Sequence, residues 1–110
     1  MSEEVQFESR RSIGRVDLRR LRYFVLVAEE LSFSRAARRA GLTQQALSSQ
    51  IRSLEDEVGR VLFFRTTRRV ELTPAGEALL PKARMSLATA AEALASARAA
   101  APDPRYNPLV

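Results

Sequence analysis

The sequence contains neither cysteine nor histidine. Without cysteine the chain cannot form disulfides, zinc-finger ligand sets or thiolate nucleophiles, and without histidine it lacks imidazole bases and His-led catalytic triads. No apolar run is long enough to span a bilayer, and the N-terminal sequence MSEEVQFESRR lacks the basic and then apolar pattern of a signal peptide. These absences exclude most catalytic classes and predict a cytoplasmic protein without metal, cofactor or membrane partner.

The net charge of +5 is distributed unevenly over the 110 residues. Residues 1–9 hold three Glu, residues 10–69 hold fourteen Arg and six acids, and residues 70–110 hold four bases and four acids. The middle segment therefore carries nearly all of the positive excess, as expected for a surface that binds phosphates. The alternative is an Arg-rich composition with solvated basic faces, because a single Lys stands beside seventeen Arg. The length predicts one modest core with extensions.

Residues 34–58 contain two short amphipathic helical patterns separated by Gly41. Ser34 is the expected N-cap of the first pattern, and Thr43 is the expected N-cap of the second. The second pattern has apolar residues spaced for one buried stripe: Leu47, Ile51, Leu54 and Val58. A chain that stops, turns and restarts within a few residues is typical of a helix-turn-helix.

The opposite side of the second pattern carries polar side chains. They are Gln45, Ser48, Ser49 and Arg52, with Gln44 at the edge. Gln can pair bidentately with an adenine edge, Ser can donate or accept a hydrogen bond, and Arg can bind guanine or phosphate. This face predicts a DNA-binding helix, and the alternative is a solvated helix face with no partner.

The flanking segments complete a small winged domain. Residues 17–30 predict a helix that is capped by Asp17 and covers the other two, with Phe33 as a core plug after it. Residues 61–64 and 70–72 predict a two-stranded hairpin, whose turn lacks Gly and Asn and should form a longer loop. Its cations are Arg65, Arg68 and Arg69, placed to reach phosphates or a narrow minor groove. The alternative is an exposed hairpin whose arginines only increase solubility.

Thr73 and Pro74 begin a long helix that should run to about Ala100 and be kinked by Pro81. Leu and Ala alternate along it in a coiled-coil seam: Leu80, Ala83, Leu87, Ala90, Leu94 and Ala97. Because so narrow a seam should not bury itself on a small domain, it predicts a homodimer. The alternative is an Ala-rich linker that is helical through the propensity of Ala. Residues 1–16 and 101–110 lack periodicity and are expected to be flexible tails.

In order, these motifs form the succession LRRLRYFVLVAEELSFSRAARRAGLTQQALSSQIRSLEDEVGRVLFFRTTRRVELTPAGEALLPKAR. This succession resembles the N-terminal domain of LysR-type transcriptional regulators, over about 16–100. The resemblance implies a mainly α fold, a three-helix winged helix-turn-helix over 17–73 with a two-stranded wing, followed by a linker or dimerisation helix over 74–100. It also implies a bacterial, nucleoid-associated transcription factor that binds a dyad operator in double-stranded DNA as a homodimer, often as a dimer of dimers.

In the family the linker leads to a larger effector-binding domain, which this sequence lacks. We therefore expect a DNA-binding fragment or a shortened member of the family. A small-molecule effector would bind only to the missing domain.

The resemblance also assigns roles to single residues. Base reading falls on Gln44, Gln45, Ser48 and Ser49. Phosphate positioning falls on Ser34, Thr43 and Gln50, and wing contacts fall on Arg65, Arg68 and Arg69. Many members have Pro at the position of Gln45 and Arg at that of Ser49, so Arg52 is expected to carry the charge of this helix instead. Glu55 is expected to be held by a nearby Arg.

Two further interpretations stay open. The first is a helical protein-interaction module, in which the basic surface binds an acidic partner and the long helix assembles subunits. The second is an enzyme built on Lys82 and Ser86, four residues apart on a helix, although no orienting residue or oxyanion arrangement accompanies them. A metal site at residues 55–57 is not expected, because adjacent side chains diverge around a helix.

Overall fold

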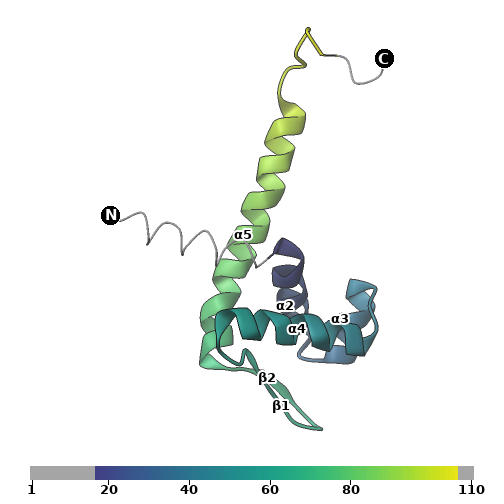
Figure 1. The fold of residues 1–110 in the computed structure, drawn as a ribbon, viewed down its shortest axis with the longest axis vertical. Helices are drawn as coiled ribbons and strands as arrows, with labels where there is room; N and C mark the ends of the chain where they lie inside the picture. The colour runs from purple at the N-terminus through teal and green to yellow at the C-terminus, as the bar shows by residue number, and fades with distance from the viewer. Residues whose placement is uncertain (1–16, 107–110) are drawn as a thin grey trace, which may run out of the picture.

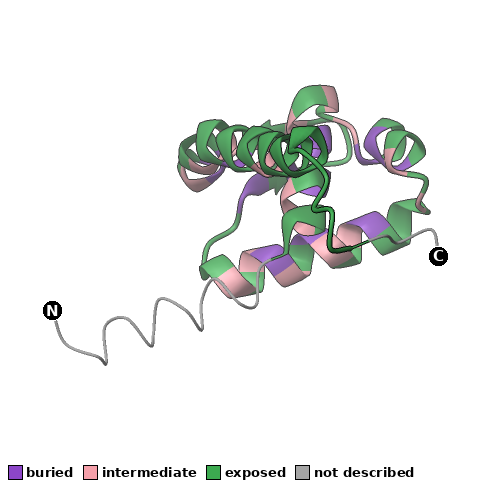
Figure 2. Cartoon of the chain, turned by 90° about the horizontal axis from the view of Figure 1, so that it is seen from above, coloured by how far each residue is buried: buried purple, intermediate pink, exposed green. Residues whose placement is uncertain are grey.

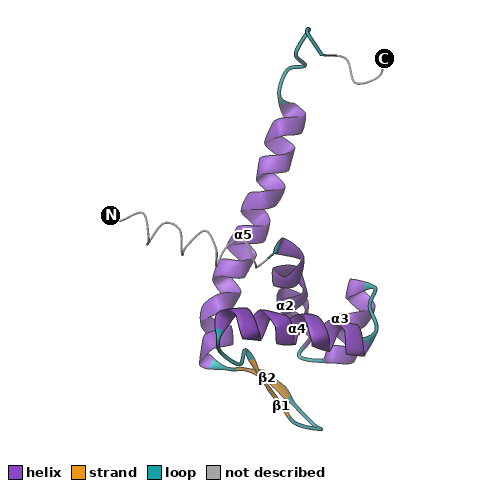
Figure 3. Cartoon of the chain, in the orientation of Figure 1, coloured by secondary structure: helices purple, strands orange, loops and turns teal. Residues whose placement is uncertain are grey.

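A computed structural model of the chain describes residues 17–106, and this part contains four helices and one β-hairpin (Figure 1). The elements are α2 (Leu18–Glu30), α3 (Phe33–Ala40), α4 (Gln44–Val58), β1 (Phe63–Arg65), β2 (Val70–Leu72) and α5 (Pro74–Ala99). Figure 3 shows the hairpin projecting beside α4 and the long α5 extending away from the other elements. The mainly α winged fold is thereby confirmed, while the tail predicted at 1–16 and the last four residues of the chain lie outside the described residues.

Each described helix begins at a short polar side chain that accepts a hydrogen bond from the backbone N–H three residues later. These caps are Asp17, Ser32, Thr43 and Thr73. Such a bond satisfies one of the N–H groups that the first turn of a helix leaves without a partner. The cap predicted at Ser34 was therefore wrong. Ser32 caps α3 instead, which makes Phe33 the first helical residue and buries its ring.

The turn of the helix-turn-helix follows the prediction at Gly41, which ends α3 in the left-handed conformation with a φ of 70°. The Leu42 N–H donates to the Ala37 carbonyl at 2.9 Å and closes the turn. Leu31, at the end of α2, also adopts a left-handed φ of 48°, although it carries a side chain. Two sharp helix ends therefore place α3 between α2 and α4.

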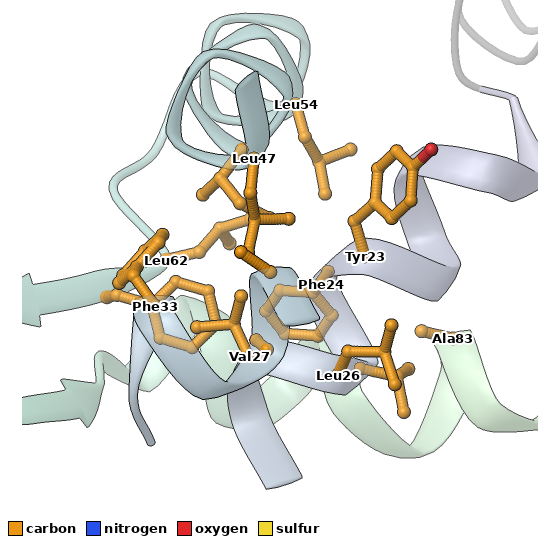
Figure 4. Packing of buried hydrophobic residues seen from close by; sticks show 14 residues of the cluster. Tyr23, Phe24, Leu26, Val27, Phe33, Leu47, Leu54, Leu62 and Ala83 are labelled. Carbon is orange, nitrogen blue, oxygen red and sulfur yellow. The ribbon is translucent and has the colours of Figure 1, made fainter. Parts of the chain in front are cut away.

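The core is centred on α2, which packs against α3, α4 and α5. Five consecutive residues of this helix, 23–27, are buried, so α2 is covered around most of its circumference and not along one stripe only. Figure 2 colours the chain by burial. Figure 4 shows Phe24 and Val27 among Leu47, Leu62 and Phe33. A helical spacing of apolar residues by itself indicates one buried stripe, whereas here three neighbouring helices cover α2 on several sides.

The hairpin pairs Phe63 with Leu72 and Arg65 with Val70 in an antiparallel register. The Phe63 ring lies 5.3 Å from the Phe24 ring and 5.9 Å from the Phe33 ring, which anchors β1 in the core. Residues 66–69 separate the strands, as expected for a turn without Gly or Asn. The Thr66 hydroxyl accepts from the N–H groups of Arg68 and Arg69 and holds this loop.

The base of the hairpin joins α4 to α5. The Glu55 carboxylate accepts from the Leu62 N–H at 2.8 Å, and the Thr73 N–H donates to the Leu62 carbonyl at 3.0 Å. The Thr73 hydroxyl also donates to the Val61 carbonyl at 2.6 Å. The Arg expected near Glu55 is Arg65, whose charge interacts with this carboxylate, but the hydrogen-bond donor is a backbone N–H, because the chain turns back after α4.

α5 continues through Pro81 as one helix of 26 residues. Its first half packs on the domain: Ala83 is buried with 1% exposure, and Leu80 and Leu87 pack against the core. The predicted seam was therefore wrong at Ala83, because α2 presents an apolar surface to it, while Leu80 and Leu87 are only partly buried there. Leu94 is 58% exposed, and Ala97 beyond it is exposed as well. Within residues 17–106, no helix is long and apolar enough to cross a membrane.

Candidate nucleic-acid interface

α4 presents a polar face to solvent. Leu47, Ile51 and Leu54 are buried against α2, and on the opposite side Gln45, Ser49 and Arg52 are exposed. The predicted apolar stripe is wrong only at Val58, which is 44% exposed because the helix has passed the core by its last residue. The outward polar face is therefore the side of α4 that a partner can reach.

This face has two edges. On one edge Gln44 and the half-buried Ser48 lie beside the hairpin. On the other edge the half-buried Gln50 contacts α2, where the Arg20 Nε donates to the Gln50 Oε1 at 3.1 Å. Figure 1 shows α4 lying across α2, with the hairpin below α4.

A groove of about 440 Å³ separates the hairpin from α3 and α4. Four arginines line it: Arg35, Arg65, Arg68 and Arg69. The remaining lining includes five hydroxyl side chains and Gln44 but no carboxylate. A second depression, of about 490 Å³, lies on α4 itself and is lined by Gln44, Gln45, Ser48, Ser49 and Arg52. The two hollows share Gln44 and Ser48 and form one basic, hydroxyl-rich surface suited to an anionic partner.

Arg65 is the cation of this groove that stacks on a core aromatic ring. Its guanidinium carbon lies 3.9 Å from the centroid of the Phe33 ring, in a cation–π stack. Partial burial lowers the pKa of Arg65 from its usual value, the Glu55 charge opposes that shift, and the Arg52 charge adds to it. Arg65 remains charged at neutral pH, because a guanidinium is not deprotonated in proteins.

The other two predicted wing cations lie in the loop. Arg68 is exposed at its tip, and the Arg69 guanidinium pairs with the Glu71 carboxylate at 3.2 Å. Both partners of this pair are more than half exposed, so the ion pair is weak and Arg69 can exchange Glu71 for another anion. The hairpin therefore offers two solvated cations at its loop and one stacked cation at its strand.

The three predicted phosphate-positioning residues lie at different places around α4. The exposed Ser34 borders the groove, with its hydroxyl oxygen 3.2 Å from that of Ser32. The Thr43 hydroxyl oxygen accepts from the Ala46 N–H at 3.0 Å and keeps its own proton for a further acceptor. Gln50 lies on the α2 edge, away from the groove. The structure thus brings Ser34 together with the wing and separates Gln50 from it.

Catalytic and metal-binding groups are not assembled in the described residues. The Ser86 hydroxyl donates to the Lys82 backbone carbonyl at 2.9 Å, as a helix permits, and so is not directed to the Lys82 amine. No group of three or more Asp or Glu residues is placed to hold a metal ion in the part of the chain that the structure describes.

Sequence reasoning missed two contacts of this surface. Neither the stack of Arg65 on Phe33 nor the bond between Arg20 and Gln50 was predicted. Both contacts join residues about thirty positions apart, and a sequence pattern carries no signal at that distance. An aromatic residue at the start of a helix and a cation in a strand are each ordinary by themselves.

Comparison with known proteins gives a consistent set of matches. A family model described as "Bacterial regulatory helix-turn-helix protein, lysR family" matches residues 18–77. The HTH-type transcriptional regulator AlsR of Bacillus subtilis is 57% identical over 72 residues, which cover 66% of this chain and 24% of AlsR. The HTH-type transcriptional regulator BudR of Klebsiella aerogenes is 54% identical over 83 residues, which cover 76% of this chain and 58% of BudR.

Solved structures agree with these matches. The CbnR_DBD–DNA complex is 39% identical with a TM-score of 0.76, and the match covers 79% of this chain and all of that one. The BenM_DBD complex with catB site 1 DNA is 38% identical with a TM-score of 0.72, and the match covers 76% of this chain and 93% of that one. The chain spans about a quarter of AlsR and just over half of BudR, and these relatives are regulators, not enzymes.

Proposed function

We propose that this chain, which belongs to the lysR family of bacterial regulatory helix-turn-helix proteins, binds double-stranded DNA to regulate transcription. The observation that carries the proposal is the basic surface formed by α4 and the hairpin, in which four arginines and no carboxylate line one groove. The similarity to two proteins whose structures are DNA complexes supports the same partner. DNA binding through such a surface is driven by release of counterions from phosphates.

In this proposal the polar face of α4 enters the major groove and reads bases. Gln45, Ser49 and Arg52 point outward, while Gln44 and Ser48 face the wing side. A bidentate Gln or Arg discriminates between bases by about 1–3 kcal/mol, and Ser contributes a less selective contact. Arg52 supplies the long cation of this face, since Ser49 is short.

The phosphates are held around this helix. Arg65, Arg68 and Arg69 bind the backbone on the hairpin side, where Ser34 adds a hydroxyl, and a cation at the loop also reaches the minor groove. Thr43 donates from the start of α4. Gln50 donates from the other edge. Contacts of this kind set register and affinity, and they carry no sequence information directly.

The exposed part of α5 beyond the core supports a homodimer that binds a dyad operator. Ala90, Leu94 and Ala97 continue the seven-residue spacing past the point where α5 leaves the core, and Leu94 is exposed. Two copies paired there present two recognition helices related by a two-fold axis. The operator is then two half-sites about 34–36 Å apart, or a multiple of that distance. Such a regulator acts in the cytoplasm, at the nucleoid.

The test is selection of preferred duplexes from a random pool, followed by affinity measurements over a range of salt concentrations. We expect enrichment of an interrupted dyad and a steep fall of affinity with salt. Failure to retain any duplex at low salt would overturn the proposal. Retention of acidic proteins under the same conditions would instead favour an interaction module with a basic surface.

A further inference from the structure

The bond between Arg20 and Gln50 fixes which way the Gln50 amide faces. An arginine side chain can only donate hydrogen bonds, so the group that it contacts must be the amide oxygen. The Arg20 Nε lies 3.1 Å from the Gln50 Oε1, and both residues are half-buried. The NH₂ group of the same amide therefore faces away from Arg20, as a donor.

The position of Gln50 on α4 determines which DNA strand its NH₂ group can reach. Around α4, Gln50 lies on the edge opposite to the one that borders the wing groove. An α-helix with its side chains is about 10–12 Å across, and the major groove is about 12 Å wide. A helix in that groove therefore brings both of its edges to the two sugar–phosphate strands that form the groove walls. The hairpin serves one strand, and the edge with Gln50 meets the other.

We propose that Arg20 is a positioning residue of the DNA interface, which holds the Gln50 amide with its NH₂ group toward the phosphate strand opposite the wing. This inference rests on the proposed binding of α4 in the major groove. It makes the N-terminal turn of α2 part of the recognition surface, although α2 is otherwise the central core helix. Without Arg20 the amide rotates freely between donor-outward and acceptor-outward orientations, and the second of these repels a phosphate.

The test is a double-mutant cycle on a duplex enriched from the random pool, with Arg20→Ala, Gln50→Ala and the double variant. Arg19→Ala is the matched control, because Arg19 is the adjacent residue, carries the same charge and pairs only loosely with Asp17 at 3.8 Å. We expect Gln50→Ala to weaken binding by about tenfold, the effect of one hydrogen bond to a charged group. Arg20→Ala should weaken duplex binding about fivefold more than Arg19→Ala does. In the Gln50→Ala background, Arg20→Ala should no longer cause this extra loss of affinity.

Salt dependence distinguishes this role from a direct contact of Arg20 with phosphate. A neutral amide releases no counterion, so Gln50→Ala should leave the slope of log affinity against log salt unchanged. Arg20→Ala should change that slope no more than Arg19→Ala. A larger loss of slope, or an excess that persists in the Gln50→Ala background, would assign Arg20 to the phosphate itself and overturn the positioning role.

Gln50→Glu is a second variant that does not depend on the stability of Arg20→Ala. A carboxylate still accepts from Arg20, so the unfolding midpoint should be retained, but it has no donor and is negative. Binding should fall by more than tenfold. If Gln50→Glu binds like the unmodified chain, the inference is wrong. If the unmodified chain binds no duplex, the proposed function fails first, and the two failures are thereby distinguished.

Discussion

The Arg65 guanidinium stacks on the Phe33 ring at 3.9 Å and ties the wing to the helix-turn-helix. Phe33 is the first residue of α3 and is buried, and Arg65 is the last residue of β1. One face of the cation is thus covered by the core, while the same residue lines the basic groove. The buried Phe33 ring therefore positions Arg65, which we propose as a DNA-binding residue.

Replacement of Arg65 by Lys should distinguish the effect of its positive charge from the effect of its stacking on Phe33. Lys keeps the positive charge but not the planar group, so the free energy of unfolding should fall by about 0.5–1 kcal/mol. Duplex affinity should fall for every sequence, because the wing is less well held. Urea unfolding and fluorescence anisotropy measure the two effects. Arg68→Lys, at the exposed loop, is the control and should leave stability unchanged; equal stability of both variants would contradict the role of the stack.

Removal of the loop cations should make duplex affinity less dependent on salt concentration. Arg68→Ala and Arg69→Ala should each reduce the slope of log affinity against log salt by about 0.9, the value for one phosphate contact. Glu71→Gln should strengthen binding slightly, since it releases Arg69 from its ion pair. Arg98→Ala, in the last turn of α5, is the matched control. Slopes equal to that of the control would remove these residues from the phosphate contacts.

Substitutions on the outward face of α4 should change sequence preference. Gln45→Ala or Arg52→Ala should cost about 1–3 kcal/mol at particular base pairs and relax the preference there. Repeated duplex selection with each variant measures this. Ser53→Ala, at a half-buried position of the same helix, should leave the profile as it is. Identical profiles for all variants would mean that α4 does not read bases.

Gly76 is predicted to be the glycine least tolerant of a side chain. A Cβ atom at this position would collide with the Leu62 carbonyl oxygen and would lie 2.8 Å from a Leu72 methyl group. Gly76→Ala should therefore destabilise the fold by about 1–3 kcal/mol, although Ala favours a helix. Thermal unfolding tests this, with Ala78→Ser, at an exposed position two residues later, as a near-neutral control. A stabilised Gly76→Ala protein would show that the joint between hairpin and α5 relaxes freely.

Dimerisation should depend on the part of α5 beyond the core. Leu94→Glu should give monomers in sedimentation and weaker binding to the dyad, with unfolding unchanged, because Leu94 is exposed in the single chain. Ser96→Glu, off the seven-residue spacing, is the control. Leu87→Glu is unsuitable because Leu87 packs against the core of its own domain. A Leu94→Glu dimer of full strength would place the interface elsewhere.

The sequence predicted the elements and most of their ends. Thr43 and Gly41 cap and end helices as their types require, since these signals act within a few residues. The cap at Ser34 was wrong because Ser32 and Ser34 are equivalent as cap residues, and the burial of Phe33 decides between them. Local chemistry offers both choices, and core packing selects one.

The outward face of α4 could also be predicted, because the spacing of Leu47, Ile51 and Leu54 defines its opposite side. The sites on this face remain predictions, since no pattern states what Gln45 or Arg52 touches. The seam on α5 was partly wrong for a related reason. A seven-residue spacing shows that an apolar line exists, whereas the surface of α2 decides that Ala83 meets its own domain.

What the sequence determined by itself is therefore local: periodicity, caps, the turn at Gly41 and the excess of arginine, each of which depends on neighbours a few positions away. Only the tertiary structure decided that Arg65 lies on Phe33, that Arg20 orients Gln50 and that Leu62 meets Glu55 and Thr73. These contacts form when packing of the apolar faces brings distant segments together. Their geometry belongs to the folded core, and no single segment of the chain contains it.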